Sequence, residues 1–232
     1  MKIASFNING IKARLPILLE WLKLAKPDVI ALQEIKCINE NFPVKAFNNL
    51  GYYVELNGQK AYNGVAILSK NQIQNTSSNL PGYQDDTQAR WIQGEIDDVL
   101  ICCLYLPNGN PYPGPKFEYK IKWMDKLFEH AKRLIPIDKK IVMLGDFNII
   151  PQNIDCLRPD NWKNDALFQP QSRQHFQKLL NLGFSDAVRV KSQANDIFTH
   201  WDYQRGAWQK NDGIRIDHIL LNPLALDSFK SC

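Results

Sequence analysis

Asp146 and Asn148 are the residues whose types and spacing first point to chemistry. They follow an apolar run, Ile141 to Leu144, that has the composition of a strand buried on both faces. Side chains alternate along a strand, so the carboxylate and the carboxamide leave its end on the same side if the extended geometry persists. Two hard-oxygen groups at the end of a buried strand are suited to hold a water, a metal ion or a phosphate.

The same arrangement occurs twice more in the chain. Ile3–Phe6 runs into Asn7, Val29–Gln33 runs into Glu34, and Asp217 lies within the last strand-like segment. Magnesium prefers one or two carboxylates together with waters and substrate phosphate, and a neighbouring Asp–Asn pair that orients a water could then hydrolyse a phosphodiester. Each residue alone could equally be a solvated loop carboxylate or part of an Asx turn. Three apolar strands that end in such groups favour a common site.

Tyr105 ends another apolar run, in the segment Tyr105-Leu106-Pro107-Asn108. Its hydroxyl could hydrogen-bond a phosphate oxygen or the leaving oxygen, and the alternative is a tyrosine at the edge of the core whose tip reaches water. Arg90 and Lys36 lie near strand ends and could contact a nucleic-acid backbone, although such cations are usually only solvated.

Aromatic and basic residues mix between positions 198 and 215. The set consists of Phe198, His200, Trp201, Tyr203, Arg205, Trp208, Lys210 and Arg215. This mixture suits stacking on sugars or bases and pairing with phosphates. A hydrophobic loop anchor with solvated charges explains it equally well.

Hydrophobic periodicity predicts helices over residues 15–25, 117–134 and 173–182, with Pro16 in the first turn of the first helix. Strands are predicted over residues 2–6, 29–33, 51–56, 64–69, 90–96, 99–106, 141–146 and 214–221. Strand and helix alternate at first, but hairpins occupy the middle. This order predicts an α/β fold with two mixed β-sheets packed together and helices outside. Nothing in the sequence marks a boundary, so a single domain over residues 1–232 is expected.

The composition is that of an ordinary globular chain of 232 residues. A net charge of +4 is compatible with a phosphate-bearing partner but does not require one. No apolar stretch approaches membrane-spanning length, and Met1 leads straight into a strand without a secretory leader. The five cysteines have neither framework nor zinc-ligand spacing, so a reduced, cytoplasmic protein is expected.

Seven short motifs occur in order across almost the whole chain. They are Ser5-Phe6-Asn7-Ile8-Asn9-Gly10, Leu32-Gln33-Glu34, Asn63-Gly64-Val65-Ala66, Tyr105-Leu106-Pro107-Asn108-Gly109, Gly145-Asp146-Phe147-Asn148, Trp201-Asp202-Tyr203 and Arg215-Ile216-Asp217. Any one of them is a weak signal. The ordered set resembles the exonuclease III family of abasic-site endonucleases, within the endonuclease/exonuclease/phosphatase superfamily, and is most similar to the bacterial branch.

The resemblance implies a four-layered α/β sandwich and a magnesium-dependent DNA repair nuclease, with Mn²⁺ as an alternative ion. Such enzymes cleave the phosphodiester 5′ to an abasic site and remove 3′ nucleotides or 3′ blocking groups. The expected partner is double-stranded DNA with abasic sites or 3′ ends, and no membrane. Nothing demands a dimer, so a monomer is expected.

The resemblance also implies roles for individual residues. Glu34 is expected to be the principal metal ligand with Asn7 beside it, Asp146 to orient or deprotonate the attacking water, and Asn148 to position water and phosphate. The other residues implied are Tyr105 and Asp217 in the catalytic group, and Trp201, Ile214 and Ile216 around the abasic sugar. Arg90 is expected to bind substrate because of its position near a strand end.

One part of the family pattern is absent. The family ends with a Ser-Asp-His segment and a further strand, and its histidine bonds the aspartate that corresponds to Asp217. Asp217-His218 is not expected to replace it, because adjacent strand residues face opposite ways, and of the other histidines only His200 could approach the site. We therefore expect a C-terminally incomplete domain with an unpaired strand edge, exposed apolar surface and impaired catalysis.

Two other functions remain open from the sequence. A phosphodiesterase of the same superfamily could act on RNA, nucleotides or lipid head groups. A non-catalytic DNA-binding remnant could keep Glu34 and Asp146 by descent, and it predicts DNA binding without magnesium-stimulated cleavage.

Overall fold

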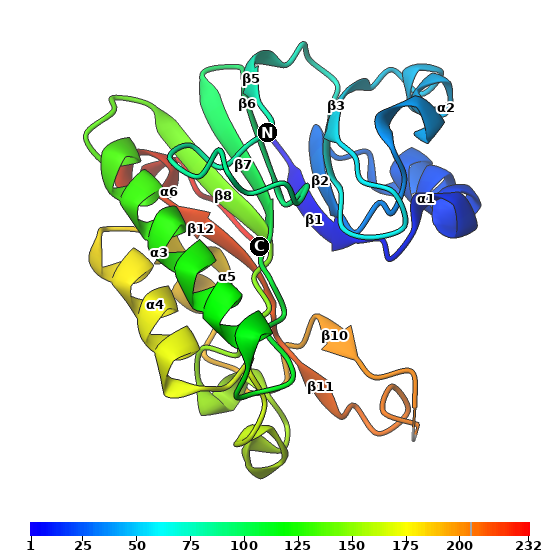
Figure 1. Ribbon diagram of the computed structural model, residues 1–232. Coiled ribbons are helices and arrows are strands. Elements are labelled where there is room, and N and C mark those ends of the chain that lie inside the picture. Colours follow the sequence, from blue (N-terminus) through cyan, green and yellow to red (C-terminus); the bar gives the residue numbers. More distant parts are fainter. Residues whose placement is uncertain (205) are drawn as a thin grey trace. The chain divides into compact units, whose positions relative to one another are not determined.

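The computed structural model describes residues 1–204 and 206–232, which form two compact units (Figure 1). Unit 1 comprises Met1–Tyr105 and Asp138–Asp146, and unit 2 comprises Leu106–Ile137 and Phe147–Cys232. Arg205, one of the aromatic and basic residues that could bind sugars, bases or phosphates, lies outside the described residues. The single domain expected over residues 1–232 stays a prediction.

Unit 1 contains two mixed β-sheets packed face to face. The first has the order β1-β2-β4-β3, with β1 parallel to β2 and the other neighbours antiparallel. Its strands are β1 (Ile3–Asn7), β2 (Val29–Gln33), β3 (Tyr53–Asn57) and β4 (Val65–Ser69).

In the second sheet of unit 1, β5, β6 and β7 are antiparallel in succession and β8 is parallel to β7. Its strands are β5 (Gln74–Ser77), β6 (Trp91–Ile96), β7 (Val99–Tyr105) and β8 (Lys140–Asp146). β2 and β4 of the first sheet contact β7 of the second, which confirms two packed mixed sheets.

The sequence explains where these strands lie and how they pair. Every residue of β2 and of β4 is buried, as expected for uniformly apolar runs at the centre of two stacked sheets. Asp97 and Asp98 form the two-residue turn between β6 and β7, both with positive φ, which matches the twist of a hairpin. The predicted hairpins 51–56/64–69 and 90–96/99–106 are both confirmed, with small shifts at their ends.

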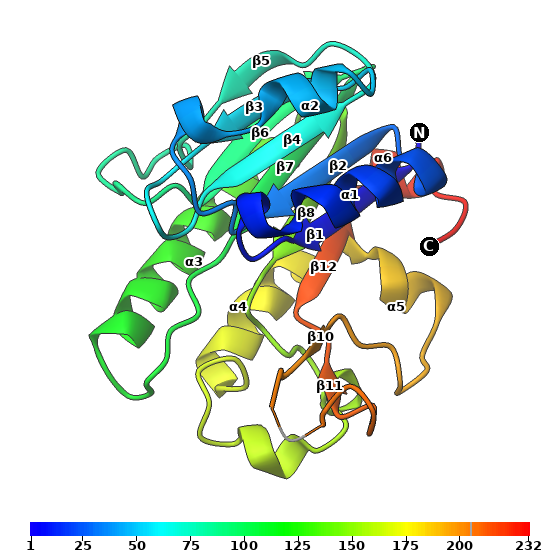
Figure 2. The same cartoon turned by 90° about the vertical axis from the view of Figure 1, so that its right-hand side faces the viewer.

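Two helices cover the outer face of the first sheet (Figure 2). They are α1 (Ile11–Ala25) and α2 (Val44–Asn48), with a short 3₁₀ turn η1 (Asn39–Asn41) before α2. Leu18 and Leu22 of α1 pack in one apolar cluster with Ile30 and Leu32 of β2. The prediction that α1 begins near residue 15 is wrong: it begins at Ile11, so Pro16 lies inside the helix and not in its first turn.

β1 forms an edge of the first sheet, because β2 is its only partner there among the described residues. Phe6 of β1 exposes 44% of its surface beside that edge. Any open sheet has two edges, and β3 forms the other one here, so the missing strand expected from the sequence stays a prediction.

Unit 2 contains two long helices that lie side by side, and short strands around the last clear strand (Figures 1 and 2). The long helices are α3 (Pro115–Leu134) and α4 (Pro170–Asn181), both within three residues of their predicted positions. The strands are β9 (Ser185–Asp186), β10 (His200–Trp201), β11 (Gly213–Ile214) and β12 (Asp217–Leu221), paired as β9–β12 and β10–β11. The short helices are α5 (Ala187–Lys191) and α6 (Pro223–Asp227), with 3₁₀ turns η2 (Asn153–Asp155) and η3 (Pro159–Trp162).

The single strand predicted over residues 214–221 is wrong, because the chain changes partners in its middle. β11 ends at Ile214, and the backbone N–H of Arg215 then donates to the carbonyl oxygen of Asp155. The N–H groups of Ile216 and Asp217 both donate to the hydroxyl of Thr199, each at 3.1 Å. β12 begins only after these side-chain and loop contacts.

A buried charge cluster ties this segment to the rest of unit 2. Arg215 Nε donates to Asp155 Oδ1 at 2.7 Å, and Arg215 Nη1 donates to Asp186 Oδ2 at 2.8 Å. Arg189 also donates to Asp155. Burial removes water from these charged groups, which costs free energy. Their hydrogen bonds to one another offset that cost.

Within the described residues, no helix has the length and apolar character needed to cross a membrane.

Candidate functional site

Asn7 lies between the two carboxylates at the strand ends of unit 1. Its side-chain amide nitrogen donates to Glu34 Oε1 and to Asp146 Oδ2, both at 2.9 Å. Asn7 Oδ1 accepts from the backbone N–H of Asn9 at 3.0 Å, which orients the carboxamide. The ends of β1, β2 and β8 thus bring together three residues that the sequence separates by as many as 139 positions.

Parallel pairing of β1 with β2 continues past the strand ends and places Asn7 beside Glu34. Asn7 is in register with Gln33, and the carbonyl oxygens of Gln33 and Glu34 accept from Ile8 N at 2.9 Å and Gly10 N at 2.7 Å. The next residues are held from the other side, because Ile35 N donates to Gly64 O and Lys36 N donates to Asn63 O. This contact gives the Asn63-Gly64 motif its structural role.

Glu34 and Lys36 both have φ of +53°, in a region that side-chain-bearing residues seldom occupy. The backbone bonds to the Asn63-Gly64 loop hold this turn in place. Backbone strain of this kind concentrates at functional sites, where the surrounding structure over-determines it.

Asp146 is positioned by the pairing of β8 with β7. Tyr105 is in register with Asp146, and Leu104 with Gly145. A Cβ at position 145 would collide with the carbonyl oxygen of Leu104, and φ there is +148°. Only glycine therefore allows the approach of the two strands immediately before the carboxylate.

Both oxygens of Glu34 have donors. Oε1 accepts from Asn7 and from the Tyr105 hydroxyl at 2.8 Å, and Oε2 lies 2.8 Å from the Lys36 ammonium. Burial acts to raise the pKa of Glu34, but the hydrogen bonds from Asn7, Lys36 and Tyr105 outweigh it and leave that pKa below its ordinary value. Glu34 is therefore an anion at neutral pH.

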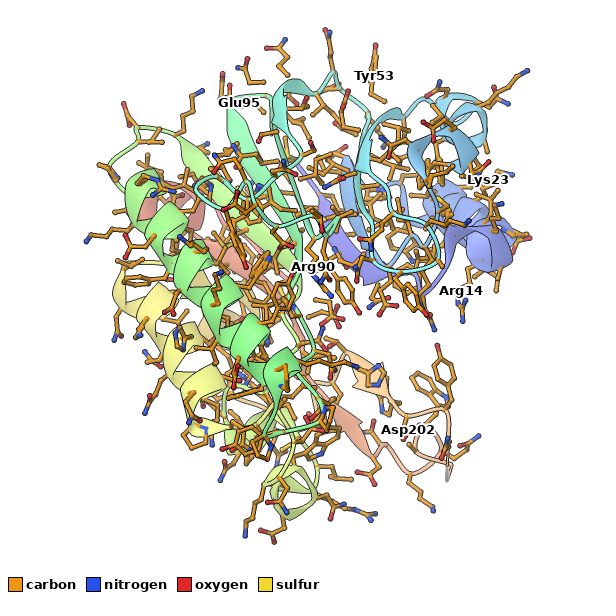
Figure 3. The ribbon with its side chains drawn as sticks, viewed as in Figure 1. Arg14, Lys23, Tyr53, Arg90, Glu95 and Asp202 are labelled. Atoms are coloured by element: carbon orange, nitrogen blue, oxygen red, sulfur yellow. The ribbon has the colours of Figure 1, made fainter. Side chains whose placement is uncertain are left out.

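Tyr105 is a hydroxyl donor in this environment. Burial first, and then the negative charges of Glu34 and Asp146, raise the pKa of Tyr105 far above its ordinary value. Arg90 lies over the Tyr105 ring, with its guanidinium carbon 4.9 Å from the ring centroid, and donates to the Tyr105 carbonyl at 3.2 Å. Figure 3 labels Arg90, and it also labels Arg14, which projects from the first turn of α1 and donates to the Asn9 carbonyl oxygen.

The donor set suits a divalent cation bound by few protein ligands. Glu34 and Asp146 supply carboxylate oxygens on either side of one amide, and magnesium commonly takes one or two carboxylates together with waters and phosphate. Among the residues that the structure describes, no group of three or more His, Cys, Asp or Glu side chains surrounds a common metal position.

Asn148 belongs to unit 2, where its side chain is held at both ends. Its Oδ1 accepts from Asn108 Nδ2 at 3.0 Å, and its Nδ2 donates to the Leu106 carbonyl at 2.9 Å. Its φ is +49°, so the extended geometry of β8 does not persist to this position. The alternation that would place Asp146 and Asn148 on one side of a strand therefore does not apply.

His218 faces the interior of unit 2, as expected from its place next to Asp217. It is 1% exposed, its Nε2 lies 3.0 Å from the Ile149 carbonyl oxygen, and its Nδ1 lies 2.9 Å from Arg215 Nη1. Burial first, and then the Arg215 charge, lower the pKa of His218 to about 4. The neighbouring Asp217 belongs to the same unit, with its backbone N–H on Thr199.

A cavity of about 450 Å³ opens in unit 2. Ile214, His200 and Trp162 contribute its apolar and aromatic wall, and Asp165 and Asp202 lie among its polar lining. Figure 3 labels Asp202, which follows β10. The structure thus places Ile214, one of the three residues expected around an abasic sugar, in the wall of a cavity.

The other two residues expected there pack differently. Trp201 contacts the ring of Trp208, with centroids 4.6 Å apart, and its Nε1 donates to Asn211 Oδ1 at 3.1 Å. Ile216 lies in a buried apolar cluster with Ile150, Cys156, Leu167 and Ile214.

Two lysines have a larger part in these contacts than the sequence suggested. Lys36 pairs with Glu34 and also donates to Asn9 Oδ1. Lys120 of α3 is fully buried, and its ammonium contacts the carbonyl oxygens of Asn108 and Asn148. A lysine at position 120 interrupts the buried helical stripe formed by Phe117, Met124, Leu127 and Ala131, a signal that the sequence contains.

Comparison with known proteins identifies the family. A family model described as "Endonuclease/Exonuclease/phosphatase family" matches residues 4–231, and the chain belongs to this family. It is 34% identical to exodeoxyribonuclease III of Haemophilus influenzae, over 96% of this chain and 88% of the relative. The resemblance stated from the motifs is confirmed, and so is the class of enzyme, a DNA repair nuclease of the exodeoxyribonuclease III type.

Solved structures with the same fold include two closely similar proteins. A 3′-5′ exonuclease (NExo) from Neisseria meningitidis is 37% identical, with a TM-score of 0.95 over 100% of this chain and 90% of that one. An AP endonuclease from Archaeoglobus fulgidus is 34% identical, with a TM-score of 0.90 over 97% of this chain and 87% of that one. The predicted α/β fold is confirmed by this likeness.

Proposed function

We propose that this protein hydrolyses phosphodiester bonds in duplex DNA with a magnesium ion, 5′ to abasic sites and at 3′ ends. This proposal rests on four side chains that meet in unit 1. Glu34 and Asp146 both accept from the Asn7 amide, and the Tyr105 hydroxyl donates to Glu34. In this arrangement Glu34 is the anionic group that would bind the ion, Asp146 is the candidate base and Tyr105 is the neutral donor. The two packed sheets of unit 1 hold these three side chains together. These are the components that hydrolysis of a phosphodiester requires.

In the proposed reaction, water attacks phosphorus, the new P–O bond forms, and the P–O3′ bond breaks, so that O3′ leaves with the bonding electrons and takes a proton from solvent water. Asp146 accepts the proton of the attacking water, and Asn148 positions the water and a phosphate oxygen. The raised pKa of Tyr105 keeps its hydroxyl protonated, and in this proposal the single hydrogen turns from Glu34 to a phosphate oxygen when substrate binds. Bound by Glu34 with Asn7 beside it, Mg²⁺ or Mn²⁺ would supply charge that stabilises the pentavalent phosphorane and the leaving oxygen.

The substrate assignment rests on the relatives. An exodeoxyribonuclease III, a 3′-5′ exonuclease and an AP endonuclease are all similar to this chain over most of its length. Their names cover both 3′-end and abasic-site activities, so we assign both to this protein. Asp217 completes the catalytic group in this proposal.

Contacts with DNA beyond the scissile phosphate are assigned to four residues. Ile214 lines the cavity of unit 2, and in this proposal Trp201 and Ile216 contact the abasic sugar together with it. An abasic nucleotide is the least costly to extrude, because no base has to be unstacked. Arg90, stacked on Tyr105, provides a positive charge for the DNA backbone. A cytoplasmic monomer is the expected form.

The test is cleavage of labelled duplexes by excess protein. One duplex carries a single tetrahydrofuran abasic analogue, a second carries a 3′-phosphate, and a matched RNA strand reports activity on another phosphoester. Mg²⁺, Mn²⁺ and EDTA are compared for each substrate. We expect Mg²⁺-stimulated incision 5′ to the abasic analogue and release of the 3′-phosphate.

Two results would contradict the proposal. DNA binding without cleavage at any Mg²⁺ concentration would indicate a non-catalytic remnant. Faster cleavage of RNA than of either DNA duplex would indicate a different phosphodiesterase.

A further inference from the structure

Lys120 is a fully buried cation in unit 2. It lies on α3, in the stripe of residues that pack inward, and none of its surface is exposed. A buried ammonium is stable only where hydrogen-bond acceptors replace the water that it has lost. Its ammonium donates to the carbonyl oxygen of Asn148 at 2.6 Å and to that of Asn108 at 3.0 Å.

These two acceptors belong to residues that are also linked through their side chains. Asn108 Nδ2 donates to Asn148 Oδ1 at 3.0 Å, and Asn148 Nδ2 donates to the Leu106 carbonyl at 2.9 Å. One ammonium therefore holds the main chain of both residues, while the two carboxamides hold one another. The φ of +49° at Asn148 shows that its main chain is in a conformation that needs such support.

The loop that carries Asn108 is shaped to admit Lys120. A Cβ at Gly109 would lie 2.7 Å from Lys120 Cδ and 3.1 Å from the Ala166 side chain, and φ at Gly109 is +93°. Asn108 Oδ1 in turn accepts from Asn110 Nδ2 at 2.9 Å, and Asn110 Nδ2 also donates to Asp165 Oδ1 at 3.0 Å. Asn108 is thus held from the side opposite Asn148, which defines the orientation of its amide.

We propose that Lys120 is a positioning residue for the nuclease reaction: it fixes Asn148 and Asn108 through their carbonyl oxygens and so aligns the Asn148 carboxamide with the substrate. This inference rests on the proposed function for the role of Asn148. A small displacement of a positioned group can cost about 100-fold in rate, so loss of this anchor affects the chemical step more than substrate binding.

The test compares Lys120→Met, Lys120→Gln and Leu127→Ala. Methionine keeps the length of the side chain but cannot donate, whereas glutamine keeps a neutral N–H donor. Leu127→Ala disturbs the packing of α3 at another buried position without removing a donor. For Lys120→Met we expect kcat on the abasic duplex to fall about 10- to 100-fold with KM within about twofold, and for Lys120→Gln a smaller fall.

A readout that does not depend on activity is the NMR signal of the Asn148 side-chain amide, assigned from its loss in Asn148→Ala. Its chemical shifts should change in Lys120→Gln and stay unchanged in Leu127→Ala. In an Asn148→Ala background, Lys120→Gln should lower kcat no further, because the two residues act as one unit. If Lys120→Met does not fold, the glutamine variant carries both readouts.

The inference is overturned if Lys120→Gln leaves the Asn148 amide unchanged, or if its effect on kcat does not exceed that of Leu127→Ala. A wild-type protein without nuclease activity would overturn the proposed function instead. The amide signals would then still decide whether Lys120 orients Asn148.

Discussion

At the scale of single residues, Glu34 is the most fully engaged side chain of the candidate site. Two neutral donors contact one of its oxygens and an ammonium contacts the other. This arrangement stabilises the anion, while Asp146 shares the Asn7 amide and adds a second carboxylate that would attract a bound cation. It also means that Lys36 supplies positive charge where a divalent ion would bind.

Glu34→Gln should reduce nuclease activity by about 10²–10³-fold, because it removes the negative charge that we propose binds the ion. The reduction should be accompanied by a higher Mg²⁺ concentration at half-maximal rate. Glu95→Gln is a matched control, since Glu95 also pairs with a lysine, Lys139, at 2.6 Å but lies away from Asn7. Equal Mg²⁺ dependence of the two variants would contradict the metal-binding role of Glu34.

Tyr105→Phe should lower kcat by about tenfold, the value of one hydrogen bond of about 1.4 kcal/mol to a reacting group. The aromatic ring stays in place, so the contact with Arg90 should survive and folding should be little affected. Tyr53→Phe, at an exposed position of β3, serves as the control. Single-turnover rates on the abasic duplex measure the difference, and an unchanged rate would exclude the hydroxyl from the reaction.

At the scale of elements, strands of unit 1 end in the candidate site residues, while buried polar contacts fix segments of unit 2. In unit 2 the Asp155 carboxylate joins Arg215, just before β12, to Arg189 of α5. Burial acts to raise the pKa of Asp155, but Arg215 and Arg189 outweigh it and lower that pKa. Asp155 therefore stays charged in the folded protein.

Asp155→Asn should destabilise the protein by about 3–5 kcal/mol, because it leaves two arginines beside a neutral partner in a buried place. Urea unfolding at pH 7 measures the free energy. Asp160→Asn is the control, since the Asp160–Lys163 pair is exposed to water and should contribute little to stability. Similar losses in the two variants would show that the buried cluster does not hold the segment before β12.

His218 should make folding stability depend on pH. Its pKa is about 4 in the folded protein and 6.5 as the ordinary value, so the unfolded chain binds a proton first as pH falls. The contribution of His218 to stability is then fully present above pH 6.5 and decreases toward pH 4, by about 1.4 kcal/mol per pH unit within that window. His218→Gln should reduce this slope, and a slope equal to that of the wild-type protein would contradict the buried neutral state of His218.

At the scale of the whole molecule, the sequence predicted the strands well because their signals are local. Apolar runs such as Val29–Gln33 and the Asp97-Asp98 turn specify strand and hairpin without reference to distant residues. The grouping of Asn7, Glu34 and Asp146 was predicted from their common position at strand ends. Their hydrogen bonds confirm that the three side chains meet.

Other features depend on contacts that a single sequence does not reveal. The start of α1 is set by the backbone hydrogen bonds that Gly10 and Ile11 donate to Glu34 and Ile35, not by the periodicity that pointed to residue 15. The extended geometry expected up to Asn148 fails because its left-handed main chain is held by Lys120 from a distant helix. A buried lysine and a surface lysine look alike in a sequence, since only the fold decides which one loses its water.

The most direct test of the central account is a double-mutant cycle on Glu34→Gln and Asp146→Asn, measured as single-turnover cleavage of an abasic duplex with saturating Mg²⁺. If the two carboxylates form one catalytic centre, each single variant should lose about 10²–10⁴-fold and the double variant little more than the worse single one. Losses that multiply fully would place the two residues in independent roles. Retention of wild-type cleavage by either variant would contradict the account.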